Sequence, residues 1–376
     1  MDTIQWFEDL GIGVKTFSIE DTCTTTSKYP RKLAFCPSVI FAHHRSGWNY
    51  QLSALRSLAT TNPNTGILVD GFVDVTFTYY MSVCPDDDKH LVHTKPWIGF
   101  IHNPPTFPMH LSFYRDQSNQ LFLSLLKNTN FIKSLPLCKG LITFSKHLAD
   151  HILSVMPSEY QHIPIEYFHL PTEPCQGTLF SIELFERNNN KSIIQIGWWA
   201  RKQLSIYYLK LREKSIISKK IRLLAFCTDD YVSRCMQDEL NSLDEQEKQI
   251  FEQSKDSVEV LNHLNNEDYD SILSMNIAFA DYWDCSASNL IIECIVRHTP
   301  ILTRRHPALV EYLGEGYPFF FSTLDEASIM LCNWDLIKET HSYLQERSKT
   351  GMLSVETFLD NFVASNLYKS LSTPSF

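Results

Sequence analysis

Residues 277–303 read IAFADYWDCSASNLIIECIVRHTPILT. The stretch begins with a short apolar run, passes through a loop of small polar residues and ends in a second apolar run after Thr299-Pro300. Between the two runs, residues 288–297 have the length and the apolar content of a buried helix. A strand, a loop, a helix and a strand in this order are typical of a parallel α/β sheet with helices packed on its faces.

The same alternation extends in both directions along the chain. In the first half we predict strands at residues 38–42, 66–69, 97–102, 140–144 and 164–168, and helices at 48–58, 119–126 and 146–155, the last capped by Ser145. In the second half we predict strands at 192–197, 221–226, 258–261, 277–280, 300–303 and 318–321, and helices at 204–215, 267–274 and 288–297. Residues 237–257 are polar and acidic, which favours an exposed helix and loop, and residues 324–368 have helical patterns throughout.

The length of the chain favours two domains. It has 376 residues, and a single hydrophobic core stops growing at roughly 250–300 residues. Residues 171–190 contain two prolines, a glycine and three consecutive asparagines, which is typical of a linker. We predict a Rossmann-like domain over residues 1–172, a linker over 173–190, a second Rossmann-like domain over 191–345 and a helical tail over 346–376.

Composition excludes some classes of function. The formal net charge of −10 argues against nucleic acid as a partner, because non-specific binding of nucleic acid needs a basic surface. The ten cysteines include no CxxC pair, which argues against a zinc ribbon, and they fit buried thiols in a reducing compartment. No signal peptide and no apolar stretch of about 18–20 residues is visible, so we predict a cytoplasmic protein. Peripheral membrane contact stays open, and the sequence does not determine the oligomeric state.

Two cations follow the predicted strand at 192–197. Gly197 ends this strand, and Arg201 and Lys202 come four and five residues later. Ligands of open α/β sheets bind at the carboxyl ends of the strands, so both cations are expected at the binding edge. A planar guanidinium beside a compact ammonium suits a diphosphate. The alternative is an exposed basic pair at the start of a helix.

The loop after residue 280 forms a second candidate site. It contains Asp284 and then a run of four small residues, Ser286-Ala287-Ser288-Asn289, that leads into the predicted helix. The backbone amides at a helix start can bind phosphate. Glu293 lies one to two turns further on, among apolar residues, where a ribose diol would provide a partner for its carboxylate. The alternative for Glu293 is a surface residue of an amphipathic helix.

A histidine ends one strand of the first domain. The apolar run at 97–102 places His102 at the carboxyl edge of the sheet, and Pro104-Pro105 then prevent helix formation. A histidine in this position can hydrogen-bond a sugar or carry a proton. A purely structural histidine at a strand end is the alternative.

The first strand-to-helix turn carries further candidates. Its residues are His44, Arg45, Ser46 and Gly47, where the glycine allows close approach of a ligand and Arg45 or His44 could contact it. The turn has neither a GxGxxG fingerprint nor a Walker lysine. Asp70 ends the next predicted strand and is placed in a similar way.

Three segments carry a resemblance to a known family. Residues 287–295, 299–302 and 307–314 resemble glycosyltransferases of the GT-B fold, closest to the large family 4 group. The resemblance implies two Rossmann-like domains facing across a cleft, with Glu293 holding the donor ribose and Arg201 and Lys202 holding the diphosphate. It implies that His102 lies near the donor sugar. It also favours retention of the anomeric configuration. No metal is required if the two cations and the helix start offset the charge of the diphosphate, and no cofactor is expected beyond the nucleotide-sugar substrate.

The sequence also departs from this family. The family places one acid eight positions before the second, but that position here is Cys285, and Asp284 lies one residue earlier. The glycine-rich loop between the two acids is replaced by residues 286–289, and the first turn lacks a pair of glycines. These differences indicate a divergent member of the group.

We therefore predict a glycosyltransferase that moves a sugar from a nucleotide-sugar donor to a hydroxyl acceptor on a glycan, a lipid or another molecule. The acceptor loops are expected at residues 79–94 and 106–116, which mix aromatic and polar side chains. If the enzyme inverts the configuration, Asp70, His44 and His102 are the candidate bases. A sugar-nucleotide epimerase of the same fold and a non-catalytic binding scaffold are the alternatives.

Overall fold

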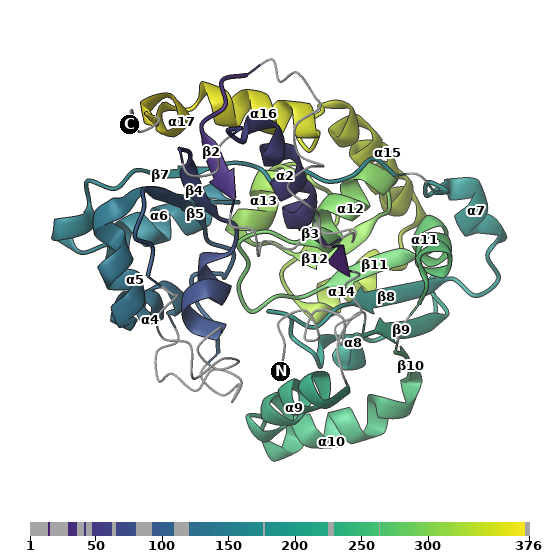
Figure 1. Ribbon diagram of the computed structural model, residues 1–376. Helices are drawn as coiled ribbons and strands as arrows, with labels where there is room; N and C mark the ends of the chain where they lie inside the picture. Colours follow the sequence, from purple (N-terminus) through teal and green to yellow (C-terminus); the bar gives the residue numbers. More distant parts are fainter. Residues whose placement is uncertain are drawn as a thin grey trace. The chain divides into compact units, whose positions relative to one another are not determined.

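The chain packs into two compact units. The computed structural model describes residues 14–15, 29–35, 41–42, 47–61, 65–79, 92–108, 120–175, 177–224, 229–262 and 264–372. Unit 1 comprises Met1–Pro105, Gln120–Glu173 and Met352–Phe376, and unit 2 comprises Thr106–Asn119 and Pro174–Gly351. Figure 1 labels the elements of both units.

Unit 1 is built on a parallel sheet of five strands in the order β2-β4-β5-β6-β7. These strands are β2 (Leu33–Phe35), β4 (Ile67–Asp70), β5 (Trp97–Phe100), β6 (Cys138–Thr143) and β7 (Ile165–Tyr167). Two further strands, β1 (Val14–Lys15) and β3 (Phe41–Ala42), pair antiparallel with each other. The helices of the unit include α2 (Gly47–Leu55), α4 (Leu121–Lys127), α5 (Thr129–Ser134), α6 (Lys146–Val155), α16 (Val355–Ala364) and α17 (Asn366–Ser370).

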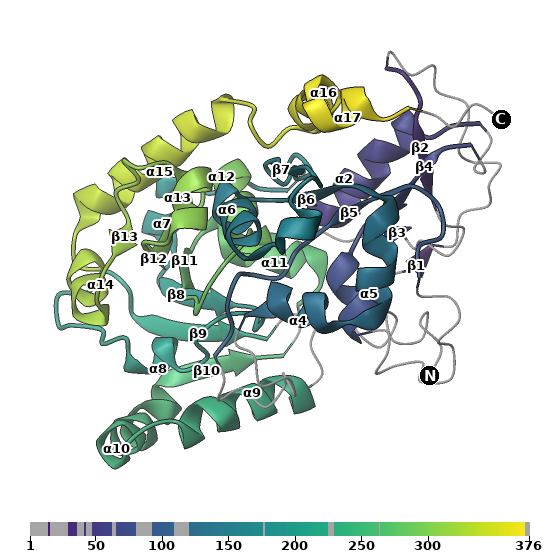
Figure 2. The same ribbon diagram turned by 90° about the vertical axis from the view of Figure 1, so that its left-hand side faces the viewer.

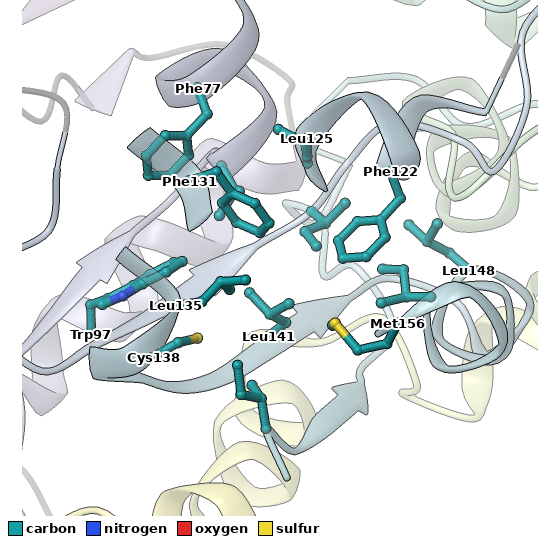
Figure 3. Packing of buried hydrophobic residues seen from close by; sticks show 14 residues of the cluster. Phe77, Trp97, Phe122, Leu125, Phe131, Leu135, Cys138, Leu141, Leu148 and Met156 are labelled. Carbon is teal, nitrogen blue, oxygen red and sulfur yellow. The ribbon is translucent and has the colours of Figure 1, made fainter. Parts of the chain in front are cut away.

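Aromatic and aliphatic side chains together form the core of unit 1 (Figure 3). Phe131 packs edge-on against Phe77, with ring centroids 5.2 Å apart, and against Trp97 at 6.4 Å. Trp97 is fully buried, and its indole N–H donates to the carbonyl of Ser134 at 2.8 Å. The polar atom of this large side chain is therefore satisfied inside the core, so its burial adds apolar contact without an orphaned donor.

Unit 2 is built on a parallel sheet of six strands in the order β10-β9-β8-β11-β12-β13. These are β8 (Ser192–Ile196), β9 (Lys219–Leu223), β10 (Val258–Leu261), β11 (Ile277–Ala280), β12 (Ile301–Arg304) and β13 (Phe320–Phe321). Counted from β8, the spatial order is 3-2-1-4-5-6, which is the order of a dinucleotide-binding Rossmann sheet. The strands that follow β8 in the chain, β9 and β10, therefore extend the sheet toward one edge, and β11, β12 and β13 extend it toward the other.

The helices of unit 2 connect these strands. They include α7 (Ile182–Arg187), α8 (Ser205–Tyr208), α9 (Asp229–Asn241), α10 (Glu245–Ser254), α11 (Asn266–Ser274), α12 (Asn289–Arg297), α13 (Pro307–Leu313), α14 (Leu324–Met330) and α15 (Trp334–Lys349). In both views α9 and α10 lie beside each other near β10 (Figures 1 and 2). Among the described residues, no helix is both long enough and apolar enough to cross a membrane.

The predicted α/β class and its parallel sheets are confirmed. The helix at 146–155 has the predicted bounds, and the Ser145 hydroxyl accepts from the amide of Leu148 as its cap. β11 and α12 also lie where the segment 277–303 predicted them. The first strand of the parallel sheet is β2, whereas the predicted strand at 38–42 lies partly outside the described residues and ends in β3.

The helix predicted at 204–215 is much shorter in the structure. Only Ser205–Tyr208 form α8, and the chain then leaves the helical path. The ammonium of Lys220 on β9 donates to the carbonyls of Tyr207 and Leu209, at 3.2 and 3.1 Å. These carbonyls would have accepted bonds from the next turn of a longer helix, so the buried lysine terminates α8.

The structure shows to which unit the segments near the predicted boundaries belong. Within the predicted linker, α7 packs on unit 2 by stacking Phe185 on Trp334, with ring centroids 5.6 Å apart. Residues 352–376 of the predicted tail belong to unit 1, where Phe358 and Phe362 contact Phe168 at 6.1 and 5.4 Å. The final helices of the chain are thus part of the packing of the first unit.

Candidate functional site

The carboxyl ends of β8 and β11 form the candidate site of unit 2. The two strands are neighbours in the sheet, and the connections that follow them lead to opposite edges. In open α/β sheets a crevice forms at such a switch point and holds the ligand. Two loops occupy this position here, residues 197–204 after β8 and residues 281–288 after β11.

Gly197 shapes the first loop. Its φ of +77° lies in the left-handed region, and a Cβ atom there would lie 3.2 Å from the guanidinium carbon of Arg201. Ala200 also has a positive φ of 57°. The loop therefore turns sharply, and the missing side chain of Gly197 leaves room for Arg201 to fold back over the end of the strand.

Backbone hydrogen bonds join the two loops. The amide of Lys202 donates to the carbonyl of Asp281 at 2.8 Å, and the amide of Trp283 donates to the carbonyl of Ala200 at 2.9 Å. The guanidinium of Arg201 lies 5.1 Å from the ring centre of Tyr282 and donates to the carbonyl of Trp199 at 2.9 Å. Arg201 is thus held in place by both loops.

Asp281 connects three cationic or polar side chains at this edge. Arg304 binds it through two parallel hydrogen bonds of 2.8 Å each, and Ser205 donates to it at 3.1 Å. The ammonium of Lys202 lies 3.8 Å from the same carboxylate and 4.9 Å from the ring centre of Trp283. Two cations therefore share one buried carboxylate. The sequence prediction missed Arg304, although it directly follows a predicted strand, as a cation at the binding edge would.

Gln203 supports the first loop from within the unit. Its side-chain amide donates to the carbonyls of Trp198 and Arg201, at 2.6 and 2.9 Å. Its carbonyl oxygen accepts a 2.6 Å hydrogen bond from Arg222, which is 1% exposed. The backbone on either side of the Arg201 turn is therefore tied to a buried side chain of β9.

Glu239 on α9 binds the end of the same loop. Its two carboxylate oxygens accept from the amides of Gln203 and Leu204, at 2.7 and 3.2 Å. Burial raises the pKa of Glu239 to about 7, and the two amides together with Arg222 and Lys202 act in the opposite direction. The two backbone amides just before α8 are therefore already hydrogen-bonded to a carboxylate of the protein itself.

Asp284 anchors the second loop. It accepts from the amide and the hydroxyl of Thr106, at 2.9 and 2.7 Å, and from the amide of Cys285 at 2.7 Å. His306 accepts from the amide of Ala308 through Nδ1, so its Nε2 carries the proton and donates to Asp284 at 2.9 Å. The carboxylate predicted to bind the donor thus accepts four hydrogen bonds within unit 2.

The second loop ends at the start of α12. Ser288 is the N-cap residue, but its side chain does not bind the first turn and lies 2.6 Å from the hydroxyl of Tyr282 instead. Ser286 is buried, Ala287 is half-buried and Asn289 is exposed. Tyr282 therefore contacts Arg201 through its ring and the N-cap residue of α12, Ser288, through its hydroxyl.

Glu293 is buried on α12, with 5% of its surface exposed. The phenol of Tyr269 on α11 donates to its carboxylate at 2.6 Å. Burial, followed by the charge of Glu293, raises the pKa of Tyr269 well above its usual value. One turn later, Arg297 forms an ion pair with Asp270 at 2.6 Å. Sequence reasoning missed Tyr269, because nothing local links it to a glutamate 24 positions later.

Asp70 and His93 form a pair in unit 1. Asp70 accepts from the amide of Phe72 at 3.0 Å and from the hydroxyl of Thr76 at 3.1 Å. Its second oxygen lies 2.9 Å from Nε2 of His93. The structure places Asp70 at the end of β4, as the sequence predicted, and adds His93 as its partner.

His102 lies two residues after Phe100, the last residue of β5. Its Nε2 is 2.9 Å from the carbonyl of Gly71, and its backbone amide donates to Asp74 at 2.7 Å. Asp70 and His102 therefore lie at the same edge of the unit 1 sheet, where Gly71 follows Asp70 in the chain and its carbonyl contacts His102. Asp74 was not among the residues predicted for the transferase site.

Most of the remaining predicted residues of the first domain lie outside the residues that the structure describes. His44, Arg45 and Ser46 lie outside the described residues, and Gly47 is the first residue of α2. Most of the two predicted acceptor loops, at 79–94 and 106–116, also lies outside the described residues. Their roles stay predictions.

Comparison with solved structures identifies the fold as GT-B, the class of two Rossmann-like units found in many glycosyltransferases. The trehalose-6-phosphate synthase OtsA matches with a TM-score of 0.56 and 10% identity, over 87% of this chain and 78% of that one. TarM, of which an S. aureus variant has been solved with UDP, matches at 0.54 and 12%, over 86% of this chain and 58% of that one. HepE from Anabaena with UDP and glucose matches at 0.52 and 9%, over 79% and 76%.

The sequence by itself matches no protein-family model and no curated protein at a significant level. This chain spans less than two thirds of the length of TarM. The predicted GT-B fold is confirmed, and the assignment to family 4 stays a prediction.

Proposed function

We propose that this protein is a glycosyltransferase that moves a sugar from a nucleotide-sugar donor to a hydroxyl acceptor. The observation that carries the proposal is the meeting of Arg201, Lys202 and the start of α12 at the switch point of the unit 2 sheet. The carboxyl edge of a Rossmann-like sheet with this strand order binds nucleotides in other proteins. The complexes of HepE with UDP and glucose and of TarM with UDP support a donor of this class.

The charges of the edge suit a leaving diphosphate. Arg201 is fixed by Tyr282 and by a backbone carbonyl, so it needs little rearrangement when negative charge develops. Lys202 and Arg304 share the single carboxylate of Asp281, so these three side chains together carry a net positive charge. We propose that these side chains offset the charge of the departing nucleotide without a metal ion.

The ribose is assigned to Glu293. The hydrogen bond from Tyr269 to Oε2 fixes the orientation of the carboxylate, and the ribose hydroxyls would donate to it. Asp284 is better suited to holding the loop than to binding the sugar, since its oxygens already accept from Thr106, Cys285 and His306.

Binding of nucleotides tests the proposal. Thermal shift and calorimetry with UDP, GDP and ADP, each alone and as its glucose conjugate, should show stabilisation by at least one of them. Arg201→Ala should weaken that binding by about tenfold or more, because it removes a charge-assisted hydrogen-bond donor. Arg305→Ala is the matched control, since Arg305 is exposed and pairs with Glu315. No binding by the wild-type protein, or equal loss in both variants, would contradict the proposal.

The stereochemistry needs a separate measurement. We propose a retaining outcome on the resemblance to family 4 alone. The coupling constant of the anomeric proton in the product, measured by NMR, distinguishes an axial from an equatorial linkage. Incubation with the donor alone gives the second control, because an epimerase would convert the donor without any acceptor.

A further inference from the structure

Two polar side chains interrupt the apolar strands beneath the loop after β8 (residues 197–204). Gln195 of β8 and Arg222 of β9 are register partners in neighbouring parallel strands, so their side chains lie on the same face of the sheet. Gln195 is fully buried and its side-chain amide donates to the carbonyl of Lys202 at 3.1 Å, while Arg222 is 1% exposed. A buried amide or guanidinium costs free energy unless it is hydrogen-bonded, so the partners of these two side chains indicate their role.

Arg222 reaches the loop through Gln203. Its guanidinium donates to the side-chain oxygen of Gln203 at 2.6 Å, and the side-chain amide of Gln203 donates to the carbonyls of Trp198 and Arg201, at 2.6 and 2.9 Å. Gln203 is itself 1% exposed. A buried cation on β9 therefore orients an amide that binds the backbone on both sides of the Arg201 turn.

Glu239 of α9 binds the other end of the loop. Its two carboxylate oxygens accept from the amides of Gln203 and Leu204, at 2.7 and 3.2 Å, although α9 lies about 35 positions further along the chain. Burial raises the pKa of Glu239, and the two amides and the charge of Arg222 act in the opposite direction. The loop and β9 therefore provide the partners that a buried carboxylate needs.

These contacts fix the backbone around both cations of the loop. The carbonyls of Arg201 and Lys202 accept from buried side chains beneath them, and the amide of Lys202 donates to the carbonyl of Asp281 at 2.8 Å. Both cationic side chains therefore start from an ordered backbone. A ligand that meets such a backbone does not spend binding free energy on ordering the loop.

We infer that Gln203, Arg222 and Glu239 are positioning residues for nucleotide binding, which act by holding the backbone of Arg201 and Lys202. The part that concerns the nucleotide rests on the proposed glycosyltransferase function, whereas the part that concerns the loop does not. Because the three side chains bind the loop or one another, their substitution leaves the guanidinium of Arg201 and the ammonium of Lys202 chemically unchanged.

NMR of the 15N-labelled full-length protein without any ligand tests the contact of Glu239. At pH 8.5, above the pKa of about 7 for Glu239, the amide proton of Gln203 should be shifted downfield by its hydrogen bond to an ionised carboxylate. Glu239→Gln should move this signal upfield. Glu245→Gln is the matched control, because Glu245 is an exposed glutamate of the neighbouring helix. Unchanged amide signals of Gln203 and Leu204 in Glu239→Gln would overturn the inference.

Calorimetry tests the nucleotide part, with whichever of UDP, GDP and ADP binds the wild-type protein best. Glu239→Gln and Gln203→Met should each weaken binding by about 2- to 10-fold, since each removes hydrogen bonds that order the loop. Gln237→Met, at an exposed position of α9, is the control for the second variant. Thermal unfolding of the same proteins completes the comparison. A loss of stability with wild-type affinity in both variants would show a merely structural role and overturn this part.

A double-mutant cycle tests whether Arg222 acts through Gln203. Arg222→Lys keeps the charge but loses the planar set of donors, so it should weaken nucleotide binding in the wild-type background. It should have no further effect in Gln203→Met, where the contact is already absent. An equal loss in both backgrounds, or none in either, would exclude Arg222 from the group. If Arg222→Lys does not fold, Glu239→Gln and Gln203→Met decide the inference.

The two parts can fail separately. Failure of UDP, GDP and ADP to bind the wild-type protein would overturn the proposed function, and the nucleotide part of the inference with it. The amide signals of Gln203 and Leu204 would still decide whether Glu239 holds the loop.

Discussion

Arg201 owes its position to contacts that can be removed without changing the guanidinium itself. The ring of Tyr282 lies under it, and the phenol of Tyr282 reaches Ser288. The two contacts belong to different parts of one side chain, so two substitutions can separate them.

We predict that Tyr282→Leu weakens nucleotide binding by about 2- to 30-fold, because a cation–π contact contributes about 0.5–2 kcal/mol. Tyr282→Phe keeps the ring and removes only the hydroxyl, so its affinity should stay close to that of the wild-type protein. Calorimetry with the nucleotide that binds best makes the comparison. Equal affinities for the two variants would show that the ring does not position Arg201.

Asp74 gives a prediction about pH. Burial raises its pKa from 3.8 to about 7. The folded protein therefore holds a proton that the unfolded chain releases between these two values, and this group stabilises the fold less as the pH rises from about 4 to 7. Asp74→Asn removes that dependence.

The free energy of unfolding of Asp74→Asn, relative to the wild-type protein, should therefore be higher at pH 8 than at pH 5, by about 3 kcal/mol or less. Denaturant unfolding at the two pH values measures the difference. His162→Gln, at an exposed site, serves as the control. A relative stability that falls as the pH rises would contradict the direction of the shift.

At the scale of the element, the loop after β8 depends on its glycine. We predict that Gly197→Ala lowers stability by about 1–2 kcal/mol, since a side chain is strained at a φ of +77°. The added Cβ would also push against Arg201 and weaken nucleotide binding. Gly316→Ala is the matched control, because a Cβ there meets nothing within 4 Å. Thermal unfolding and calorimetry on the two variants decide whether the losses of stability and binding come from the geometry of this loop or from any replacement of glycine by alanine.

Local signals explain which elements the sequence predicted well. The bounds of α6 follow from a serine cap and an apolar face, both within about ten residues of one another. The length of α8 depends on Lys220 from another strand, and no pattern within residues 204–215 contains that information. Elements whose ends are set by distant side chains therefore escape a sequence-based prediction.

The candidate site shows the same division. The positions of Arg201 and Lys202 after a strand and of Glu293 on a helix could be predicted because strand ends and helix starts can be located from sequence, and their roles stay predictions. Tyr282 beside Arg201 and Tyr269 beside Glu293 could not be assigned, since each meets its partner only through the tertiary fold. Arg304 was overlooked although it directly follows a predicted strand, and only the tertiary fold shows that it binds Asp281.

At the scale of the whole molecule, unit 1 depends on the last helices of the chain. α16 packs beside α2 (Figures 1 and 2). Phe362 is fully buried against Phe168, and the amide of Leu367 donates to Glu166 at 2.8 Å. Residues 352–376 thus act as part of the first unit although they follow the second.

We predict that Phe362→Ala lowers the stability of unit 1 by about 3–5 kcal/mol, because it removes a buried ring and leaves a cavity. Hydrogen exchange should become faster in β5, β6 and β7, while β8 and β11 keep their protection. Ile329→Ala, at an exposed apolar position of unit 2, is the control. Uniform loss of protection in both sheets would contradict the assignment of the segment to unit 1.

The split composition of unit 1 bears on how the chain is made in the cell. A ribosome delivers domains from the amino terminus onward, and the first one usually matures first. Here unit 2 ends at Gly351, before the helices that complete unit 1 are translated. The sheet of unit 1 therefore lacks the cover over Phe168 until residues 352–376 have been made, whereas every segment of unit 2 is present once Gly351 has been added.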